Sequence, residues 1–258
     1  MIRLLSALIL SLFLMACSDD DVKSDPYADW SALEFYDEST MALESGAFEE
    51  AIKHLENLEA RFPFSPYARQ AQLDVAYAYY KFDEPESAIA AADRFIRLNP
   101  RDPNVAYAWY LKGLADFNRG SGFMDGLFTR DISLHDNKSM DDALRSFSTL
   151  VERYPDSKYA PDSYQHMLFL RNKMAEAELH AARYYIKRKA WLAAVKRGQS
   201  VLETYPTTPA SRDALAIMIT AYKELGLNDL AADAQSVLDA NPVIEKVAGS
   251  DDNTLSAP

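Results

Sequence analysis

Cysteine and glycine are both scarce in this sequence, and each shortage excludes a class of structure. A single cysteine, Cys17, among 258 residues excludes an internal disulfide and a zinc site built from cysteines. Only 8 glycines, about 3% against a typical usage of roughly 7%, argue against a β-sandwich or barrel with many glycine turns. Positive charge is also short, because 27 Lys and Arg face 39 Asp and Glu and leave a net charge of −12. Since such a chain repels a phosphate polyanion, we expect no nucleic-acid partner.

Sequence motifs for catalysis are missing as well. The four histidines form no His-Glu-x-x-His pair, and His166 and His180 lie about 21 Å apart if they share a helix, which is too far for one metal ion. No phosphate-binding glycine motif and no Gly-x-Ser-x-Gly motif occurs. No pair of carboxylates stands out as a general acid and base. We therefore expect no enzymatic activity, no catalytic residue, no metal site and no cofactor.

The first sixteen residues are typical of a secretory signal. Arg3 precedes an apolar run over residues 4–16, which is shorter than the roughly 20 residues that a membrane-spanning helix needs. The junction Leu-Met-Ala-Cys at residues 14–17 resembles the lipobox of bacterial lipoproteins. That resemblance implies an N-acyl and S-diacylglycerol lipid on Cys17, and Ser18 after it implies the periplasmic face of the outer membrane. An ordinary signal peptide with an incidental cysteine is the alternative.

Two further segments lie outside the expected folded region. Residues 17–30 are polar and acidic, which predicts a flexible tether. Residues 243–258 show no periodicity, which predicts a disordered tail. The folded region is expected to cover residues 31–242.

Proline and alanine recur along the folded region at matching intervals. A proline follows an aromatic residue or Asn at five positions, with spacings of 37, 55, 51 and 36: Pro63, Pro100, Pro155, Pro206 and Pro242. An alanine stands 11 or 12 residues before each of them: Ala51, Ala88, Ala143, Ala194 and Ala231. The base unit is 37 residues, and two intervals carry insertions of 18 and 14 residues.

Each unit has the pattern of two helices followed by proline. Small residues stand where two helices must approach, large apolar residues follow helical spacing, and proline ends the second helix. This pattern resembles the tetratricopeptide repeat. It predicts an all-α fold, an α-solenoid of about five tetratricopeptide-like helix pairs that forms a curved superhelix. A generic helical bundle is the alternative.

The two insertions differ in kind. The insertion within residues 118–139 is rich in glycine, which predicts an irregular loop within the third pair, with four apolar residues packed on the array or on a partner: Phe123, Met124, Leu127 and Phe128. The other insertion precedes the fourth pair and has no internal glycine. It predicts one helix of about 28 residues over residues 161–188.

Several local strings, together with the lipobox and the repeats, resemble the BamD family. They include Arg-Phe-Pro-Phe-Ser-Pro-Tyr at 61–67, Tyr-Ala-Tyr-Tyr-Lys at 77–81, Asp-Arg-Phe-Ile-Arg-Leu-Asn-Pro at 93–100 and Arg-Asp-Ala-Leu at 212–215. This family is the lipoprotein subunit of the machine that assembles β-barrel proteins in the Gram-negative outer membrane. The resemblance covers about residues 14–242. The segment 126–136 departs from the family pattern, because it keeps Phe128, Arg130 and Asp131 but lacks a second aromatic residue.

Two surfaces are candidates for binding. In the N-terminal half, residues 31–155, the helical register predicts a peptide groove lined by aromatic and apolar side chains: Tyr36, Tyr67, Leu73, Tyr77, Tyr80, Tyr107, Tyr110 and Phe117. Packing between helices is the alternative for these tyrosines. In the C-terminal half, residues 156–242, a basic stripe with Arg188, Lys196 and Arg197 predicts docking of an acidic partner, or else simply balances local charge.

The family resemblance implies what these surfaces bind. It implies that the groove takes unfolded outer-membrane proteins, read through an apolar C-terminal signal that ends in an aromatic residue. It also implies that the C-terminal half contacts the BamA-type barrel subunit, where Arg197 matches an arginine important in the family, and the accessory lipoproteins. The sequence hypothesis is a non-catalytic, lipid-anchored scaffold of β-barrel assembly. The alternative is an adaptor of the same repeat class that presents clients to an envelope protease or a peptidoglycan enzyme.

Overall fold

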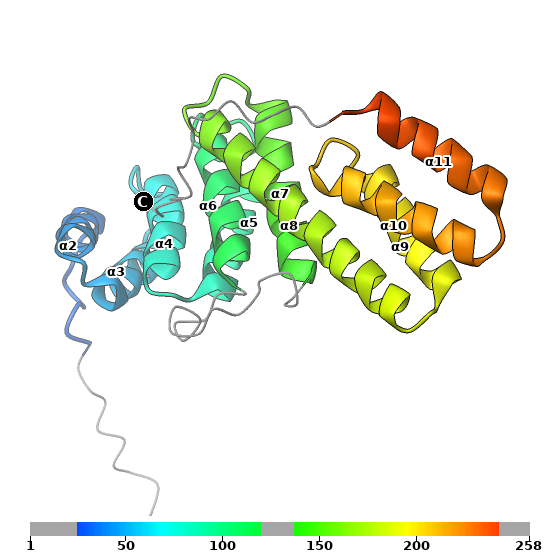
Figure 1. The fold of residues 1–258 in the computed structure, drawn as a ribbon. Helices are drawn as coiled ribbons and strands as arrows, with labels where there is room; N and C mark the ends of the chain where they lie inside the picture. Colours follow the sequence, from blue (N-terminus) through cyan, green and yellow to red (C-terminus); the bar gives the residue numbers. More distant parts are fainter. Residues whose placement is uncertain (1–24, 120–136, 243–258) are drawn as a thin grey trace, which may run out of the picture. The chain divides into compact units, whose positions relative to one another are not determined.

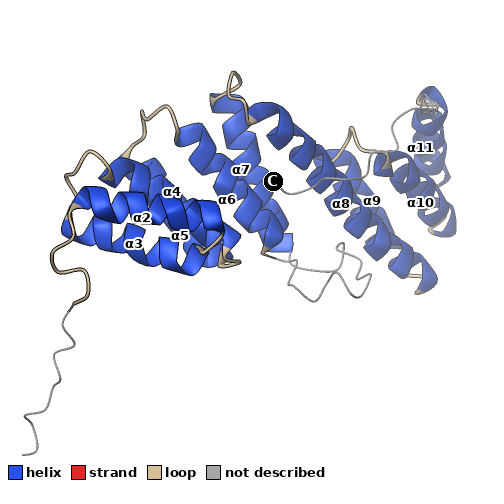
Figure 2. Cartoon of the chain, turned by 90° about the vertical axis from the view of Figure 1, so that its left-hand side faces the viewer, coloured by secondary structure: helices blue, strands red, loops and turns tan. Residues whose placement is uncertain are grey.

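The described part of the chain, residues 25–119 and 137–242 of a computed structural model, consists of helices and turns without a strand (Figures 1 and 2). The helices within these ranges are α2 (Ala32–Ser45), α3 (Phe48–Arg61), α4 (Ala68–Lys81), α5 (Pro85–Leu98), α6 (Val105–Asn118), α7 (Asn137–Arg153), α8 (Ala160–Lys187), α9 (Trp191–Thr204), α10 (Ala210–Glu224) and α11 (Asn228–Ala240). The chain divides into two compact units, one ending at Ala68 and one beginning at Arg69. The predicted all-α fold of helix pairs is confirmed.

Successive helices pack as hairpins. Contacts join α2 with α3, α6 with α7, α8 with α9 and α10 with α11. In the second pair, Asn99 at the end of α5 donates a hydrogen bond from its side-chain amide to Gln72 of α4 at 3.0 Å. The five repeated alanines are all buried, with at most 3% of each exposed: Ala51, Ala88, Ala143, Ala194 and Ala231. Their burial confirms that small residues mark the close approaches between helices.

In the four pairs whose inner turn the structure describes, that short turn contains one residue with left-handed backbone. These residues are Gly46, Asp83, Lys189 and Gly226, with φ angles of 78°, 61°, 57° and 72°. Glycine adopts this conformation without a steric penalty, whereas the same conformation costs free energy in a residue with a Cβ atom. In the third pair the insertion stands at this point, and its four apolar residues lie outside the described residues.

The turns between pairs share one hydrogen-bonding pattern. Each second helix ends with an N–H that donates to the carbonyl four residues back, at 2.8 Å in all four cases: Phe62, Asn99, Tyr154 and Tyr205. The next residue in each case is one of the repeated prolines. Because proline has no N–H to continue the helix, the chain turns there and the next pair begins.

Helix α8 confirms the prediction of one long helix. It has 28 residues and begins one residue before the predicted start. One face of it enters the core of the second unit through Leu170, Met174 and Leu179. The other core residues around them come from α6, α7, α9 and α10, so α8 connects the helices on either side of it.

The predicted tether is wrong for its last six residues, 25–30. Trp30 stacks on the buried His54 at 5.2 Å between ring centroids, and Tyr27 meets the same ring edge-on at 5.3 Å. Arg61 donates to the carbonyl oxygen of Tyr27 at 2.8 Å and pairs with Asp25. This segment is therefore held against α3, because its two aromatic side chains gain contacts that a solvated tether lacks.

The predicted start of the helical array at residue 31 is also where α2 is capped. The Ser31 hydroxyl accepts from the Glu34 N–H at 3.3 Å, and the Glu34 carboxylate accepts from the Ser31 N–H at 2.7 Å. This reciprocal pair satisfies two donors that would otherwise lack partners at the helix start. Residues 17–24 and 243–258 lie outside the described residues.

Candidate functional site

Three tyrosines stack where α6 meets the start of α8. The rings of Tyr107 and Tyr110, both on α6, each lie 5.0 Å from the ring of Tyr159, with interplanar angles of 28° and 23°. Tyr159 directly precedes α8 and is its N-cap residue. The stack therefore fixes the turn between the third and fourth pairs against α6.

Tyr107 also lies near side chains of α4. Burial raises the pKa of Tyr107 well above its ordinary value, and the neighbouring Tyr159, Tyr77, Asp74 and Tyr80 raise it further. Tyr80 accepts a hydrogen bond at 3.1 Å from the amide of Asn118 on α6. Hydroxyls of α4, α6 and the turn before α8 therefore gather in one region, and raised pKa values keep those of Tyr80 and Tyr107 protonated near neutral pH.

Two predicted groove residues belong to the core instead. Tyr110 is 7% exposed, packs on Phe147 and donates its hydroxyl to Asp162 at 2.7 Å, while Leu73 is 3% exposed. The sequence prediction was wrong for both, because helical register gives the direction of a side chain but not the depth of what covers it. Tyr77, Tyr80, Tyr107 and Phe117 are only partly buried.

Phe117 packs among aromatic rings at the far end of α6. Its ring meets His166 edge-on at 5.0 Å and Phe169 at 5.7 Å. His166 stacks on Phe147 at 4.8 Å, and its Nε2 atom lies 3.3 Å from the Asp162 carboxylate. Burial lowers the pKa of His166 more than Asp162 raises it, so the imidazole is neutral at pH 7. His166 therefore acts as an uncharged packing residue between Phe117 and Phe147.

The remaining two groove residues belong to the first unit. Tyr36 of α2 and Tyr67 stack at 5.2 Å with an interplanar angle of 22°, and both are partly buried. They form a pair of their own within that unit.

Sequence reasoning missed Tyr159 and Phe169. A signal for Tyr159 was present, since Tyr67 stands four residues after Pro63 and Tyr159 stands four residues after Pro155. The same position in two repeats thus carries tyrosine, and each of them stacks on a tyrosine of its own unit. Phe169 offered no comparable signal, because its position within a long helix fits core and surface equally.

The predicted docking residues lie on α9 and at the end of α8. Arg197 donates from Nη1 to both carboxylate oxygens of Glu178 at 3.1 Å, which ties α9 to α8, and this contact raises the pKa of Arg197. The Arg197 side chain is still 45% exposed. The Arg188 guanidinium lies 5.9 Å from the centre of the Tyr184 ring, and Lys196 is exposed. The three cations are accessible, but Arg197 also has a structural role.

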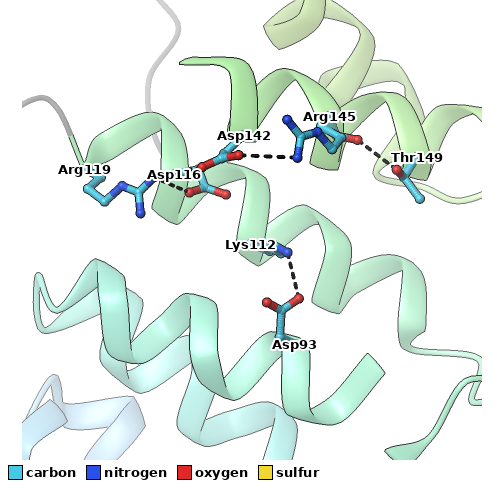
Figure 3. Close-up of polar contacts among 7 residues, drawn as sticks. All are labelled: Asp93, Lys112, Asp116, Arg119, Asp142, Arg145 and Thr149. Carbon is cyan, nitrogen blue, oxygen red and sulfur yellow. Dashed lines mark hydrogen bonds and ion pairs between the residues drawn. The ribbon is translucent and has the colours of Figure 1, made fainter. Parts of the chain in front are cut away.

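A charged network joins α6 to α7 on either side of the insertion (Figure 3). Asp116 is 1% exposed and contacts Arg119 at 3.1 Å, and Arg119 reaches Asp142 of α7 at 3.3 Å. Burial raises the pKa of Asp116 to about 6. About one turn earlier on α6, Lys112 pairs with Asp93 of α5 at 2.7 Å. The network holds the two ends of the insertion together.

Two other kinds of site are absent from the described residues. Within residues 25–119 and 137–242, no three or more His, Cys, Asp or Glu side chains are grouped so as to hold a metal ion. No helix in the part of the chain that the structure describes has both the length and the apolar character to cross a membrane. Cys17, the predicted lipidation site, lies outside the described residues.

Comparison with known proteins identifies relatives along nearly the whole chain. The family model described as "YfiO: Outer membrane lipoprotein" matches residues 28–238. A protein of Neisseria meningitidis is 42% identical over 242 residues, which cover 93% of this chain and 91% of the relative. One of Vibrio cholerae is 38% identical over 239 residues, covering 93% and 98%. Both are named outer membrane protein assembly factor BamD.

Solved structures give weaker likenesses. The TPR2AB domain of yeast Sti1 in complex with pHSP90 has a TM-score of 0.44 at 14% identity, and the match covers 81% of this chain and 76% of that one. A MamA structure has a TM-score of 0.40 at 16% identity, covering 78% and 92%. Scores this low do not bear on the geometry of this chain. The family model matches residues 28–238, and the two relatives are 42% and 38% identical to the chain. The chain therefore belongs to the YfiO family of outer membrane lipoproteins, the family of the BamD assembly factors.

Proposed function

We propose that this protein is a non-catalytic scaffold of outer-membrane β-barrel assembly, which binds unfolded clients and docks on the BamA subunit. The assembly role follows from family membership, because relatives matched over more than nine-tenths of this chain are named outer membrane protein assembly factors. The observation that carries client binding is a set of partly buried aromatic side chains on α4, α6 and the start of α8, here called the tyrosine cluster: Tyr77, Tyr80, Tyr107, Phe117 and Tyr159.

The tyrosine cluster suits an apolar peptide that ends in an aromatic residue. Tyrosine offers a large contact area with few rotatable bonds, so little conformational entropy is lost on binding. Its hydroxyl can pair with backbone groups of an extended client, which sequence-independent recognition requires. Raised pKa values keep the hydroxyls of Tyr80 and Tyr107 protonated, so both remain hydrogen-bond donors.

Client binding is tested with a fluorescent peptide that ends in the C-terminal residues of a β-barrel protein. The double variant Tyr77→Ala, Tyr80→Ala should weaken binding by about 1–3 kcal/mol while helical content persists. Tyr164→Ala is the matched control, since Tyr164 is 49% exposed on α8 and makes no contact with the cluster that the structure records. Unchanged affinity in the double variant, or an equal loss in the control, would show that the tyrosine cluster does not bind clients.

Docking on BamA is proposed for Arg188, Lys196 and Arg197. Lys196→Glu is the cleanest probe, because Lys196 is exposed and its reversal disturbs no ion pair that the structure records. Arg197→Glu would also place a carboxylate against Glu178, so a loss of binding there has two causes. We expect Lys196→Glu to weaken capture of BamA from detergent-solubilised membranes by about threefold to tenfold. Capture of a protease or a peptidoglycan enzyme in place of BamA would favour the adaptor hypothesis.

Anchoring through Cys17 completes the proposal. Family membership supports it, since the family is described as outer membrane lipoproteins. Two or more acyl chains hold a soluble domain firmly on a membrane, because each buried CH₂ contributes about 0.8 kcal/mol. Mass spectrometry of the N-terminal peptide from membranes should show a lipidated Cys17 as the first residue, and Cys17→Ala should release the protein from the membrane fraction. An unmodified N-terminal peptide beginning elsewhere would contradict the anchor.

A further inference from the structure

A groove lies between α8 and α10 in the C-terminal part of the second unit. It has a volume of about 490 Å³ and is lined by eight residues: His180, Arg183, Tyr184, Ile186, Lys187, Ala216, Ile217 and Thr220. The two helices contact each other directly, so the groove follows the seam between them. None of these residues belongs to the tyrosine cluster or to the three proposed docking residues.

The groove exists because the two helices carry side chains of unequal size. Helix α8 contributes Tyr184 and Ile186, whereas two of the three lining residues of α10, Ala216 and Thr220, are small and exposed, and the third is Ile217. The lining positions on α8 span eight residues, a rise of about 10 Å or two helical turns. Small residues on one wall leave the backbone of that helix open to close approach, which is the geometry of a site for a short amphipathic segment.

The charge on the groove is the opposite of the charge on the chain. The lining includes Arg183, Lys187 and a histidine but no carboxylate, in a chain of net charge −12. Arg183 pairs across the seam with Asp213 at 2.6 Å, while Lys187 has no ion-pair partner among the described residues. An apolar floor with an unpaired cation at its rim complements a segment that carries apolar side chains beside carboxylates.

Tyr184 provides an anchor at the edge of the groove. It is 52% exposed and is held from the side by Tyr185, at 5.7 Å between ring centroids, and by the guanidinium of Arg188. An exposed aromatic ring that is already fixed in place loses little entropy when it is buried, so such residues commonly dominate binding energies.

We propose that the α8/α10 groove binds an acidic amphipathic segment of a partner protein, as a docking site separate from the tyrosine cluster. The inference does not need the partner to be BamA, and it stands or falls independently of client binding. The partner is recognised by chemistry: apolar side chains on one helical face with Asp or Glu beside them.

The test uses a fluorescent synthetic helix of about 14 residues, with leucines at i, i+3, i+4 and i+7 and glutamates beside them. The full-length chain in detergent should bind it with a Kd below about 100 μM, and binding should weaken as salt is raised. Ala216→Trp, which fills the groove, and Lys187→Glu, which reverses its rim charge, should each weaken binding at least tenfold. Ala232→Trp and Lys223→Glu are the matched controls, because both residues are exposed and neither lines the groove.

Four results would overturn the proposal. They are absence of binding, equal binding of a peptide with lysines in place of glutamates, unchanged affinity in both groove variants, and equal losses in the controls. Two more outcomes would assign the groove to another occupant and refute the proposal as stated. Tighter probe binding after deletion of residues 243–258 would identify the chain's own tail, and dimerisation abolished by Ala216→Trp would identify a second copy. The client-peptide assay on the tyrosine cluster reports separately, so failure here leaves it unaffected.

Discussion

The close approach of α6 and α7 at Gly113 makes a sharp test of the helix-pair packing. A Cβ atom at this position would lie 2.6 Å from Cε1 of Phe147 and 2.8 Å from two further ring atoms. Phe147 is fully buried, and its ring is stacked on His166 at 4.8 Å, so it has no free volume into which to move. Gly113→Ala should therefore destabilise the fold even though alanine is the better helix former.

The magnitude follows from two opposing effects. Replacing glycine by alanine within a helix contributes about 1 kcal/mol of stability through backbone entropy. Inserting a methyl group into a fully packed core costs about 1–3 kcal/mol, and the overlap with a rigid ring places Gly113 in the upper part of that range. The net expectation is a loss of about 1–2 kcal/mol in the free energy of unfolding, or a fall of about 2–8 °C in Tm.

Gly198 provides the matched comparison. A Cβ atom there would meet Cγ of Met218 at 2.6 Å, an overlap as close as the one at Gly113. Methionine is unbranched and adapts by changing rotamers, so Gly198→Ala should cost less than Gly113→Ala. Adding Phe147→Leu to Gly113→Ala should relieve the overlap, giving a combined loss smaller than the sum of the two single losses.

Urea and thermal unfolding followed by circular dichroism measure all four variants. The reasoning fails if Gly113→Ala is as stable as the parent chain, or if Gly198→Ala loses more stability than Gly113→Ala. Strict additivity of Gly113→Ala and Phe147→Leu would show that the ring does not transmit the strain.

Three further expectations follow from single features of the structure. Lys189 and Gly226 both have left-handed backbone. Lys189→Gly should therefore raise the free energy of unfolding by about 0.5–1 kcal/mol, whereas Gly226→Ala should lower it by about 1 kcal/mol. Urea titration would contradict this expectation if both changes had the same sign. The pKa of the buried Asp116 is about 6, above the value of about 3.9 for an unfolded chain, so its stabilising contribution is present below pH 4 and is lost as pH rises through 6. Asp116→Asn removes this dependence, so the stability of the variant relative to the parent should be greater at pH 7 than at pH 4.5; a constant difference would argue against the raised pKa. Trp30→Ala removes the stack on His54 and should cost about 1–3 kcal/mol, while Trp30→Phe should recover most of it; equal losses would show that the ring contact contributes little.

The positions of the turns between helix pairs were predictable from the sequence because the physics there is local. Proline has no N–H to donate, so Pro63 and Pro155 end helices wherever they stand. Alanine marks the helix crossings, since a larger side chain at Ala88 or Ala194 would hold the two backbones apart. These effects need no knowledge of distant residues, which is why the start of α8 was predicted to within one residue.

The depth of each side chain was not predictable in the same way. Tyr107 and Tyr110 are three residues apart on one helix and look equivalent in the sequence, yet Tyr110 is in the core and Tyr107 is only partly buried. The difference comes from Phe147 and Asp162, which reach Tyr110 from other helices. Likewise, nothing in the local sequence indicates that Arg197 pairs with Glu178, because the two residues belong to different helices.

The left-handed turns show how a repeat can lose its sequence signal while it keeps its geometry. Gly46 and Asp83 are 37 residues apart, as are Lys189 and Gly226, so each pair of positions differs by one base unit. Glycine is visible as a repeat signal at two of these positions, whereas Asp83 and Lys189 adopt the same backbone at a cost that packing of the flanking helices must offset. The repeat is therefore visible in the sequence where glycine avoids the steric penalty of left-handed backbone. It is hidden where packing of the flanking helices offsets that penalty for another residue. The same reasoning applies to binding surfaces, because a groove such as that between α8 and α10 depends on contacts between helices and not on a motif within either one.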